Sequence, residues 1–135
     1  MTQITGVVER LVLATNAHDL DALGECFASD FVNETPLHPA RNFKGRDQVR
    51  RNWSAIFAGV PDIRAKVLRS VADPDTAWVE WEMSGNRAHG GAHLMRGVTV
   101  MGIAHDEIQW IRFYLQPVEE GGVGVDAAIR QAVNR

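Results

Sequence analysis

Residues 76–116, TAWVEWEMSGNRAHGGAHLMRGVTVMGIAHDEIQWIRFYLQ, decide the fold. Apolar and polar residues alternate in three runs of this stretch, at 76–85, 94–104 and 108–116. Alternation with a period of two is typical of β-strands, because successive side chains of a strand point to opposite faces. Turn-forming residues separate the runs, at His89-Gly90-Gly91 and at His105-Asp106. The stretch therefore predicts a meander of three strands.

Outside this meander, the sequence predicts one more strand before it and helices near both ends. Residues 63–72 alternate loosely and end at the turn sequence Asp73-Pro74-Asp75. Apolar residues recur at helical spacing in three segments, at about 2–17, 20–27 and 45–59. A short strand stopped by proline is expected at 31–37, and a short C-terminal helix at about 125–134. This order predicts a single α+β domain over residues 1–135, with helices on one side of the sheet.

Composition and charge exclude several classes of protein. Hydrophobic residues make up 45% of the 135 residues and charged residues 23%, which is typical of a globular chain. The net charge of −3 argues against a nucleic-acid or anionic-membrane partner, since both require a basic surface. We see neither a secretory signal at the start nor an apolar stretch of about 20 residues, so we expect a cytoplasmic protein. The single cysteine, Cys26, cannot form an internal disulfide.

The two best-defined strands each have one apolar face and one mixed face. In 76–85 the apolar face carries Val79, Trp81 and Met83, and the mixed face carries Trp78, Glu80 and Glu82. In 108–116 the apolar face carries Ile111, Phe113 and Leu115, and the mixed face carries Ile108, Trp110, Arg112, Tyr114 and Gln116. Two interpretations are open. The mixed face lines a ligand cavity and the apolar face packs on a second copy, or the apolar face meets the helices and the charges face water.

Five short strings along the chain carry a family resemblance. They are FASDF at 27–31, NETPL at 33–37, GRD at 45–47, PD at 61–62 and YLQP at 114–117. Together they resemble the SnoaL-like branch of the nuclear-transport-factor-2-like (cystatin-like cone) superfamily. The resemblance implies a cone-shaped α+β barrel, with N-terminal helices packed on a curved antiparallel sheet. Polyketide cyclases, ketosteroid isomerases, epoxide hydrolases and non-enzymatic binders share that fold, so the implied function is broad.

The resemblance also implies where the pocket lies. In such cones the concave sheet face and the helices enclose a pocket, and the convex face commonly forms a dimer. We therefore expect the mixed face to line the pocket. The apolar face is then expected to form a homodimer through Val79, Trp81, Ile111, Phe113 and Leu115.

The family's catalytic positions carry other residue types in this chain. The aspartate that such cyclases and hydrolases place in the closing strand falls on Gln116. The hydrolases' Arg and Asp in a middle strand fall on Glu80 and Glu82, and their water-holding Tyr and Asn fall on Val32 and Glu34. Proton transfer in this chain therefore requires a relocated base.

Glu80 and Glu82 are the main candidates for that base. Two residues along a strand separate Cα atoms by about 6.6 Å. Two carboxylates at that separation repel by about 2.5 kcal/mol at an effective dielectric near 20, which would keep one of them neutral near pH 6. A carboxyl group with such a pKa suits general acid–base catalysis. Alternatively, Arg112 or Arg96 neutralises the pair, or the two glutamates simply face solvent.

The other candidate residues have supporting roles. Glu34 could take a proton, the Gln116 amide could orient a carbonyl or a water, and the Tyr114 hydroxyl could donate to an oxyanion. Further substrate contacts are expected from His38, in a loop near the pocket, and from Val32, Trp53, Phe57, Trp78, Arg96, Val98 and Trp110. His89 and His93 flank a glycine turn, which is a poor metal-binding arrangement, so we expect no metal and no cofactor.

These residues predict a small enzyme that moves a proton on a hydrophobic, oxygenated molecule in a cyclisation, isomerisation or hydration. Glu80 or Glu82 would be the base, with Arg112, Tyr114 and Gln116 as orienting groups. The alternative is a non-catalytic, dimeric protein that binds a small ligand in the same pocket. An enzyme like the epoxide hydrolases is the third possibility.

Overall fold

The computed structural model describes residues 6–134, and it confirms the α+β class. The helices are α1 (Gly6–Ala17), α2 (Leu20–Glu25), α3 (Arg46–Gly59) and α4 (Val125–Val133), with a 3₁₀ turn η1 at Pro39–Arg41. The strands are β1 (Phe27–Glu34), β2 (Phe43–Lys44), β3 (Arg64–Ala72), β4 (Thr76–Asn86), β5 (Ala92–Ala104), β6 (Glu107–Phe113) and β7 (Gln116–Pro117). Residues 2–5 of the first expected helix lie outside the described part.

The strands form one curved sheet in the order β2-β1-β6-β5-β4-β3, and β7 pairs with β5. Neighbours from β3 to β6 are antiparallel, as the meander predicts. The expectation of a wholly antiparallel sheet is wrong, because β1 and β6 are parallel. Parallel pairing is possible there because α3 and strands β3 to β5 form a long crossover between the two. Within residues 6–134 no pairing joins the edge strands β2 and β3, so the cone is open.

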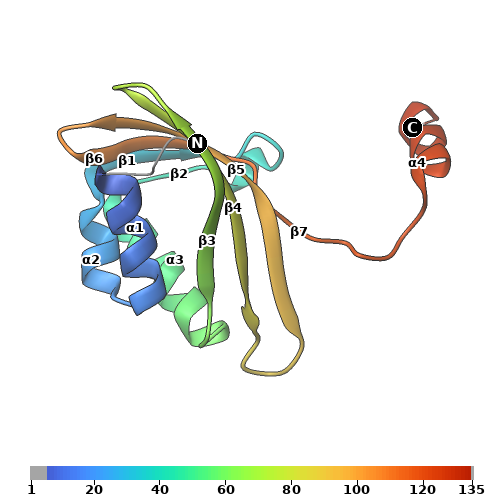
Figure 1. The fold of residues 1–135 in the computed structure, drawn as a ribbon, viewed down its shortest axis with the longest axis horizontal. Helices are drawn as coiled ribbons and strands as arrows, with labels where there is room; N and C mark the ends of the chain where they lie inside the picture. The colour runs from blue at the N-terminus through green and yellow to red at the C-terminus, as the bar shows by residue number, and fades with distance from the viewer. Residues whose placement is uncertain (1–5, 135) are drawn as a thin grey trace.

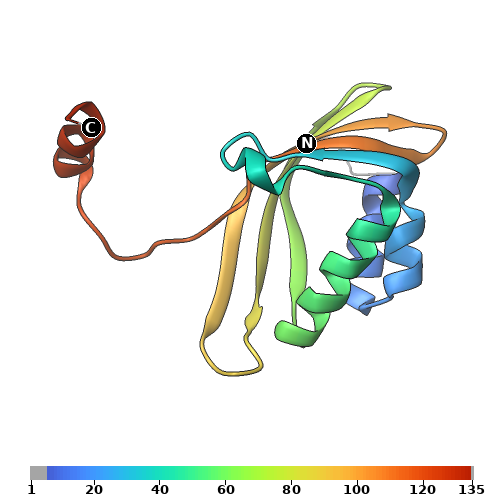
Figure 2. The same cartoon turned by 180° about the vertical axis from the view of Figure 1, so that it is seen from behind.

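Helices α1, α2 and α3 lie together on the concave side of the sheet, and α4 projects away from the opposite side (Figures 1 and 2). The core between the three helices and the sheet is mostly apolar, with Thr15 and Thr99 among its few buried polar residues. Its largest buried side chains include Leu23, Phe31, Ile63, Met101 and Ile108. This packing places one sheet face against the helices, and no other layer within the described part of the chain covers the opposite face.

Two predicted segments begin and end elsewhere than expected. Helix α2 begins after Asp19, whose Oδ1 accepts a hydrogen bond from the Ala22 backbone N–H at 3.0 Å, and it ends at Glu25. The first strand therefore begins at Phe27 rather than at residue 31. The cause is packing, because Phe27 and Phe31 are both buried and contact each other edge to face, with ring centroids 4.8 Å apart.

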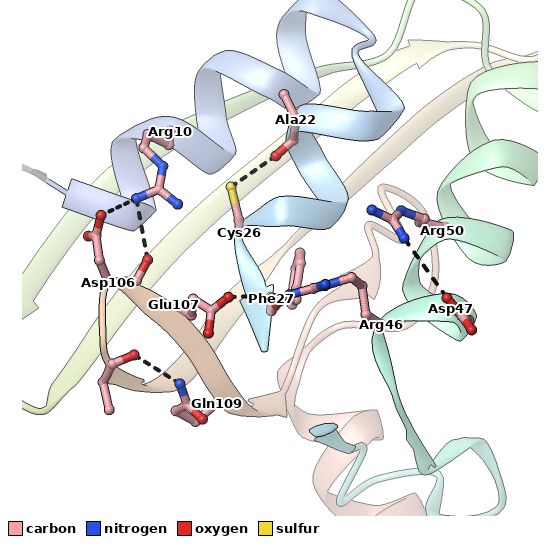
Figure 3. A network of polar contacts seen from close by, with 11 residues as sticks. Arg10, Ala22, Cys26, Phe27, Arg46, Asp47, Arg50, Asp106, Glu107 and Gln109 are labelled. Atoms are coloured by element: carbon pink, nitrogen blue, oxygen red, sulfur yellow. Dashed lines mark hydrogen bonds and ion pairs between the residues drawn. The ribbon is translucent and has the colours of Figure 1, made fainter. Parts of the chain in front are cut away.

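The turn between β5 and β6 lies at His105-Asp106, where the sequence predicts it. His105 has φ of 54° and Asp106 has φ of 59°, which is the conformation of a two-residue type I′ hairpin turn. Asp106 also holds α1 against this hairpin, because its carboxylate pairs with Arg10 (Figure 3). The first helix and the β5–β6 hairpin are thereby joined at one end of the sheet.

The face assignment drawn from the resemblance is wrong. Val79 and Trp81 are 0% and 2% exposed on the concave side, whereas Trp78 is 56% exposed on the convex side. The Trp81 indole N–H donates to Thr99 Oγ1 at 2.8 Å, so the polar atom of this tryptophan is satisfied inside the core. All five residues predicted for the dimer face belong to the core or pack against it: Val79, Trp81, Ile111, Phe113 and Leu115. The apolar face therefore packs against the helices and the charged residues face water, as the second interpretation of the sequence states.

Within the described residues, no helix is long and apolar enough to cross a membrane. The same part of the chain holds no cluster of three or more His, Cys, Asp or Glu side chains placed to bind a metal ion. Cys26 is buried beneath α2, where its thiol donates to the Ala22 carbonyl at 3.4 Å (Figure 3). Burial raises the pKa of this thiol, an effect that Arg10 partly opposes.

Candidate functional site

A cavity of about 720 Å³ lies between the helices and the concave face of the sheet. Its wall is mostly apolar and combines aromatic with flexible thioether side chains. The residues that define this character are Phe31, Trp53, Trp81, Phe113, Met95 and Met101. A volume of this size holds a small organic molecule with one or more rings.

Neutral polar side chains interrupt the apolar wall in two places. Asn33 and Thr35 of the β1 end are joined by a hydrogen bond from Asn33 Nδ2 to Thr35 Oγ1, at 3.1 Å. On α3, Gln48 Nε2 donates to Asn52 Oδ1 at 2.8 Å. These amide and hydroxyl groups give the cavity a few fixed positions for hydrogen bonding to a ligand.

Arg41 and His93 are the titratable side chains on the cavity wall, and within the described residues no Asp or Glu lines it. His93 lies on β5, on the same face as Met95. Burial lowers the pKa of His93 below its usual value, and the nearby Arg87 lowers it further. An imidazole with a lowered pKa is neutral near pH 7 and is therefore able to accept a proton.

Gln116 and Trp53 are the two predicted site residues that line the cavity. Gln116 lies on β7, and the pairing of β7 with β5 brings this segment to the cavity, with Pro117 opposite Met95. Gly97 permits this pairing, since a Cβ atom there would lie 2.2 Å from the Tyr114 carbonyl oxygen. Trp53 lies on α3 and packs against Phe57, with ring centroids 5.6 Å apart.

The remaining predicted site residues do not line the cavity. They are Glu34, Glu80, Glu82, Arg112, Tyr114, Val32, His38, Phe57, Trp78, Arg96, Val98 and Trp110. The strand registers explain most of this result, because the side chains of paired residues share a face. Glu80 pairs with Val98 and Glu82 pairs with Arg96, and all four lie opposite the face of Trp81.

The two central glutamates form ion pairs on the convex face. Glu82 Oε2 lies 2.9 Å from Arg96 Nε, and Glu80 Oε1 lies 3.9 Å from Arg69 Nε. Each carboxylate therefore has its own cation, and the predicted repulsion between two uncompensated carboxylates does not apply. The predicted base role of Glu80 and Glu82 requires a place in the cavity that they do not have.

Glu34, Arg112 and Tyr114 come together, but also outside the cavity. Arg112 Nη1 lies 3.2 Å from Glu34 Oε2, and Arg112 Nε donates to Tyr114 Oη at 3.4 Å. Glu34 and Arg112 face each other because β1 and β6 pair in this register. The group is a surface network that ties the two parallel strands together.

Phe57 and His38 lie near the cavity without lining it. Phe57 stacks on His18, with ring centroids 4.9 Å apart, and it also packs against the cavity residue Trp53. His38 lies in the loop before η1, where its backbone N–H donates to the Thr35 carbonyl at 2.9 Å.

Sequence reasoning missed Arg41, Asn42, His93 and Thr99, which all line the cavity. Arg41 and Asn42 belong to η1 and the residue after it, a turn that carries no periodic signal. His93 and Thr99 could have been found. They lie at even spacing from Met95 and Met101 on one strand, and Thr99 belongs to the face whose pairing partners include Val79.

The family model described as a SnoaL-like domain matches residues 8–111 of this chain. A search of curated proteins finds no match. Several solved structures are similar. A candidate polyketide cyclase from Sinorhizobium meliloti has a TM-score of 0.62 and 25% identity, over 82% of this chain and 93% of its own.

Two further structures contain small molecules. A Catenulispora acidiphila protein with a ketosteroid isomerase-like fold, crystallised with trimethylamine, has a TM-score of 0.69 and 18% identity, over 83% of this chain and 87% of its own. RV0760c from Mycobacterium tuberculosis, in complex with estradiol-17beta-hemisuccinate, has a TM-score of 0.67 and 17% identity. The similarity covers 78% of this chain and 88% of its own. The match over residues 8–111 spans α1 to β6, and the similar structures have the same cone of helices on a curved sheet. On these grounds the chain belongs to the SnoaL-like domain family.

Proposed function

We propose that this chain binds a hydrophobic small molecule carrying oxygen groups in the cavity of the cone. The observation that carries the proposal is the cavity of about 720 Å³, whose apolar wall is interrupted by a few amide and hydroxyl groups. Two proteins of similar fold, crystallised with trimethylamine and with a steroid ester, support the use of this cone for small ligands. Gln116 lines the cavity, and we expect its amide to orient a ligand carbonyl, because an amide both donates and accepts.

Filling part of the cavity with a larger side chain tests the proposal. Met95 lines the cavity, whereas its neighbour Leu94 does not and has its Cα partner, Ser84, on the convex face. We expect Met95→Trp to weaken binding of the neutral fluorescent probe pyrenebutanol by about tenfold or more, because the indole would occupy ligand space. Leu94→Trp is the matched control and should leave the affinity unchanged. Failure of the wild type to bind, or equal losses in both variants, would contradict the proposal.

A second candidate function is proton transfer on the bound molecule, with His93 as the base. It is favoured by the position of His93 on the cavity wall and by its lowered pKa, which makes the imidazole neutral at pH 7. The expected chemistry remains isomerisation, cyclisation or hydration without a cofactor. The carboxylate route through Glu80 or Glu82 is replaced by His93, because the two glutamates face away from the cavity.

A β,γ-unsaturated ketone that isomerises to its conjugated form provides a direct assay, since conjugation is visible by ultraviolet absorbance. We expect turnover that falls by about a hundredfold in His93→Gln, the usual magnitude for loss of a general base. His89→Gln is the control, because His89 is exposed and does not line the cavity. Equal rates in the two variants, or no turnover above that of buffer, would exclude this second function.

A homodimer through the convex face remains part of the proposal, with different residues from those predicted. Val71 and Trp78 are Cα partners on β3 and β4, and they are 66% and 56% exposed. Trp110, at 36% exposed, lies on the same face against Gly102. Exposed aromatic and aliphatic side chains of this kind are typical of protein–protein contact surfaces.

Light scattering after size exclusion measures this association. We expect the wild type to elute as a dimer and Trp78→Glu to shift it toward the monomer, since a buried unpaired carboxylate opposes assembly. Leu37→Glu is the control, because Leu37 is 58% exposed but lies in the loop after β1. A monomeric wild type, or equal effects of the two substitutions, would contradict the dimer.

A further inference from the structure

Arg41 is the cation on the cavity wall, and its guanidinium has no partner among residues 6–134. Six other arginines form ion pairs with carboxylates: Arg10, Arg46, Arg50, Arg69, Arg96 and Arg112. Within residues 6–134, no side chain or carbonyl accepts a hydrogen bond from the Arg41 guanidinium. A guanidinium without a partner at the edge of an apolar cavity is available to an anion that enters with a ligand.

The charge of the wall has one sign. Apart from Arg41, its one titratable side chain is His93, and Arg87 adds further positive charge close to His93. Since no Asp or Glu among the described residues lines the cavity, nothing in its wall repels an anionic ligand. The cavity is thus more positive than the chain as a whole, whose net charge is −3.

Two amide side chains of the wall, Asn42 and Asn52, also favour an anionic ligand. The side-chain oxygen of Asn42 accepts from the Thr35 backbone N–H at 2.6 Å, and that of Asn52 accepts from Gln48 Nε2 at 2.8 Å. Both amide oxygens are therefore used within the protein. No acceptor among the described residues takes a hydrogen bond from the side-chain N–H groups of Asn42 or Asn52. The wall offers free donors, which suit a ligand rich in acceptors.

From the unpaired Arg41, the absence of wall carboxylates and the free amide donors, we propose that the ligand is an apolar acid. Its carboxylate lies at the Arg41 end of the cavity, and its apolar body lies among the aromatic and methionine side chains. A planar guanidinium binds a carboxylate through two parallel hydrogen bonds, so Arg41 also sets the ligand's orientation. This inference rests on the proposed function, because it names the class of molecule that the cavity binds.

Two probes that differ only in their terminal group test the inference. Pyrenebutyrate and pyrenebutanol share one aromatic body, and they end in a carboxylate and a hydroxyl group. We expect the wild type to bind pyrenebutyrate about three- to tenfold more tightly, as measured by fluorescence titration at low salt. The preference should shrink as salt is added, because Arg41 is exposed enough to be screened.

Arg41→Gln isolates the responsible side chain, with Arg64→Gln as the control. Arg64 is exposed at the start of β3, forms no ion pair among those described and does not line the cavity. We expect Arg41→Gln to abolish the preference for pyrenebutyrate, because the substitution weakens binding of the charged probe more than binding of pyrenebutanol. Arg41→Lys should keep part of the preference, because the charge remains and the paired hydrogen bonds are lost.

The outcomes separate this inference from the proposed function. If neither probe binds the folded wild type, the proposed ligand cavity itself fails. If pyrenebutanol binds and pyrenebutyrate binds no better, the cavity stands and the apolar-acid assignment is overturned. Equal loss of preference in Arg41→Gln and Arg64→Gln overturns it as well, because the effect would then belong to net charge rather than to Arg41.

Discussion

Arg46 connects the first turn of α3 to the sheet on which the cavity is built (Figure 3). Its Nε donates to the Phe27 carbonyl at 2.9 Å, and its Nη2 lies 3.2 Å from Glu107 Oε2. The two charged side chains are only 27% and 35% exposed. We expect Arg46→Met to lower the free energy of unfolding by about 1–3 kcal/mol, because the carbonyl and the carboxylate lose a charged donor. Urea denaturation measures the loss.

Arg69→Met is the comparison for this prediction. Arg69 is 86% exposed, and its Nε lies 3.9 Å from the Glu80 carboxylate, so the pair is well solvated. Its removal should change the free energy of unfolding by about 0–0.5 kcal/mol. Similar losses in Arg46→Met and Arg69→Met would show that partial burial does not strengthen the Arg46 contacts.

His93 makes the stability of the cavity wall sensitive to acid. Its pKa is lowered from 6.5 by burial and then by Arg87, so the folded state binds the proton less readily than the unfolded chain. Above pH 6.5 both states hold a neutral imidazole and the group has no effect on stability. As the pH falls below that value, the unfolded chain takes up the proton first and the folded state loses stability.

We therefore expect His93→Gln to lose less stability than the wild type between about pH 7 and pH 5. Thermal unfolding followed by circular dichroism across this pH range measures the difference. The exposed residue His89 provides the control, since its replacement by glutamine should leave the wild-type pH profile in place. If His93→Gln loses more stability than the wild type as the pH falls, the prediction is contradicted.

Gly97 is a strand residue whose missing side chain positions β7. It has φ of +154°, and an added Cβ would lie 2.2 Å from the Tyr114 carbonyl oxygen and 2.7 Å from Leu115 Cα. Both contacts are with backbone atoms, which cannot rotate away as the end of a flexible side chain can. Gly97→Ala should therefore lower the free energy of unfolding by about 1–3 kcal/mol. It should also weaken probe binding, because Leu115 and Gln116 line the cavity.

Gly59→Ala separates this close approach from the general effect of replacing a glycine. Gly59 ends α3, and a Cβ added there meets nothing within 4 Å. We expect a change of at most about 0.5 kcal/mol and unaltered probe affinity. A loss in Gly59→Ala as large as that in Gly97→Ala would remove the backbone contact as the explanation.

The longer helices and strands were predictable because they follow a periodic pattern. Helix α3 and strands β3 to β5 lie within two residues of their expected positions. The short elements η1 and β2 were missed, since three and two residues carry no period. The parallel pairing of β1 with β6 was missed for another reason. The direction of this pairing depends on how the long crossover between β1 and β6 folds. Alternation along a single strand does not indicate which strand it pairs with or in which direction.

The cavity itself was poorly predicted, and β4 shows why. Both of its faces carry a tryptophan, so bulk alone could not identify the inner face. The two faces of β4 are distinguished by the residues that they contact on other strands. Trp81 donates to Thr99 inside the core, whereas Glu80 and Glu82 pair with arginines outside it. The general rule that charges face water was correct here, and the family resemblance was the misleading argument.

Two apolar surfaces on the same side of the molecule are not covered by any part of residues 6–134. One is the exposed part of the convex face, around Val71 and Trp78. The other is a stripe along α4, with Val125, Ile129 and Val133 exposed at 74%, 58% and 73%. Figures 1 and 2 show α4 at the end of an extended segment, away from the three helices that build the cavity. The cavity and these surfaces therefore lie on opposite sides of the sheet.

The exposed position of α4 leads to a prediction about its stability. A helix of nine residues is shorter than the roughly 12–15 residues that even good helix-forming sequences need in water. Since no other described residue covers its apolar stripe, α4 lacks the packing that stabilises α3. We expect the backbone amides of residues 125–133 to exchange with deuterium at close to the unfolded rate under conditions where light scattering finds a monomer.

Amides of α3 should exchange far more slowly in the same sample, because this helix packs on the core through buried Val49 and half-buried Trp53. Raising the protein concentration separates two causes of any protection in α4. Protection that grows as dimer forms would mean that a second copy covers the stripe. Protection equal to that of α3 in the monomer would contradict the prediction, since it would require α4 to pack on its own chain.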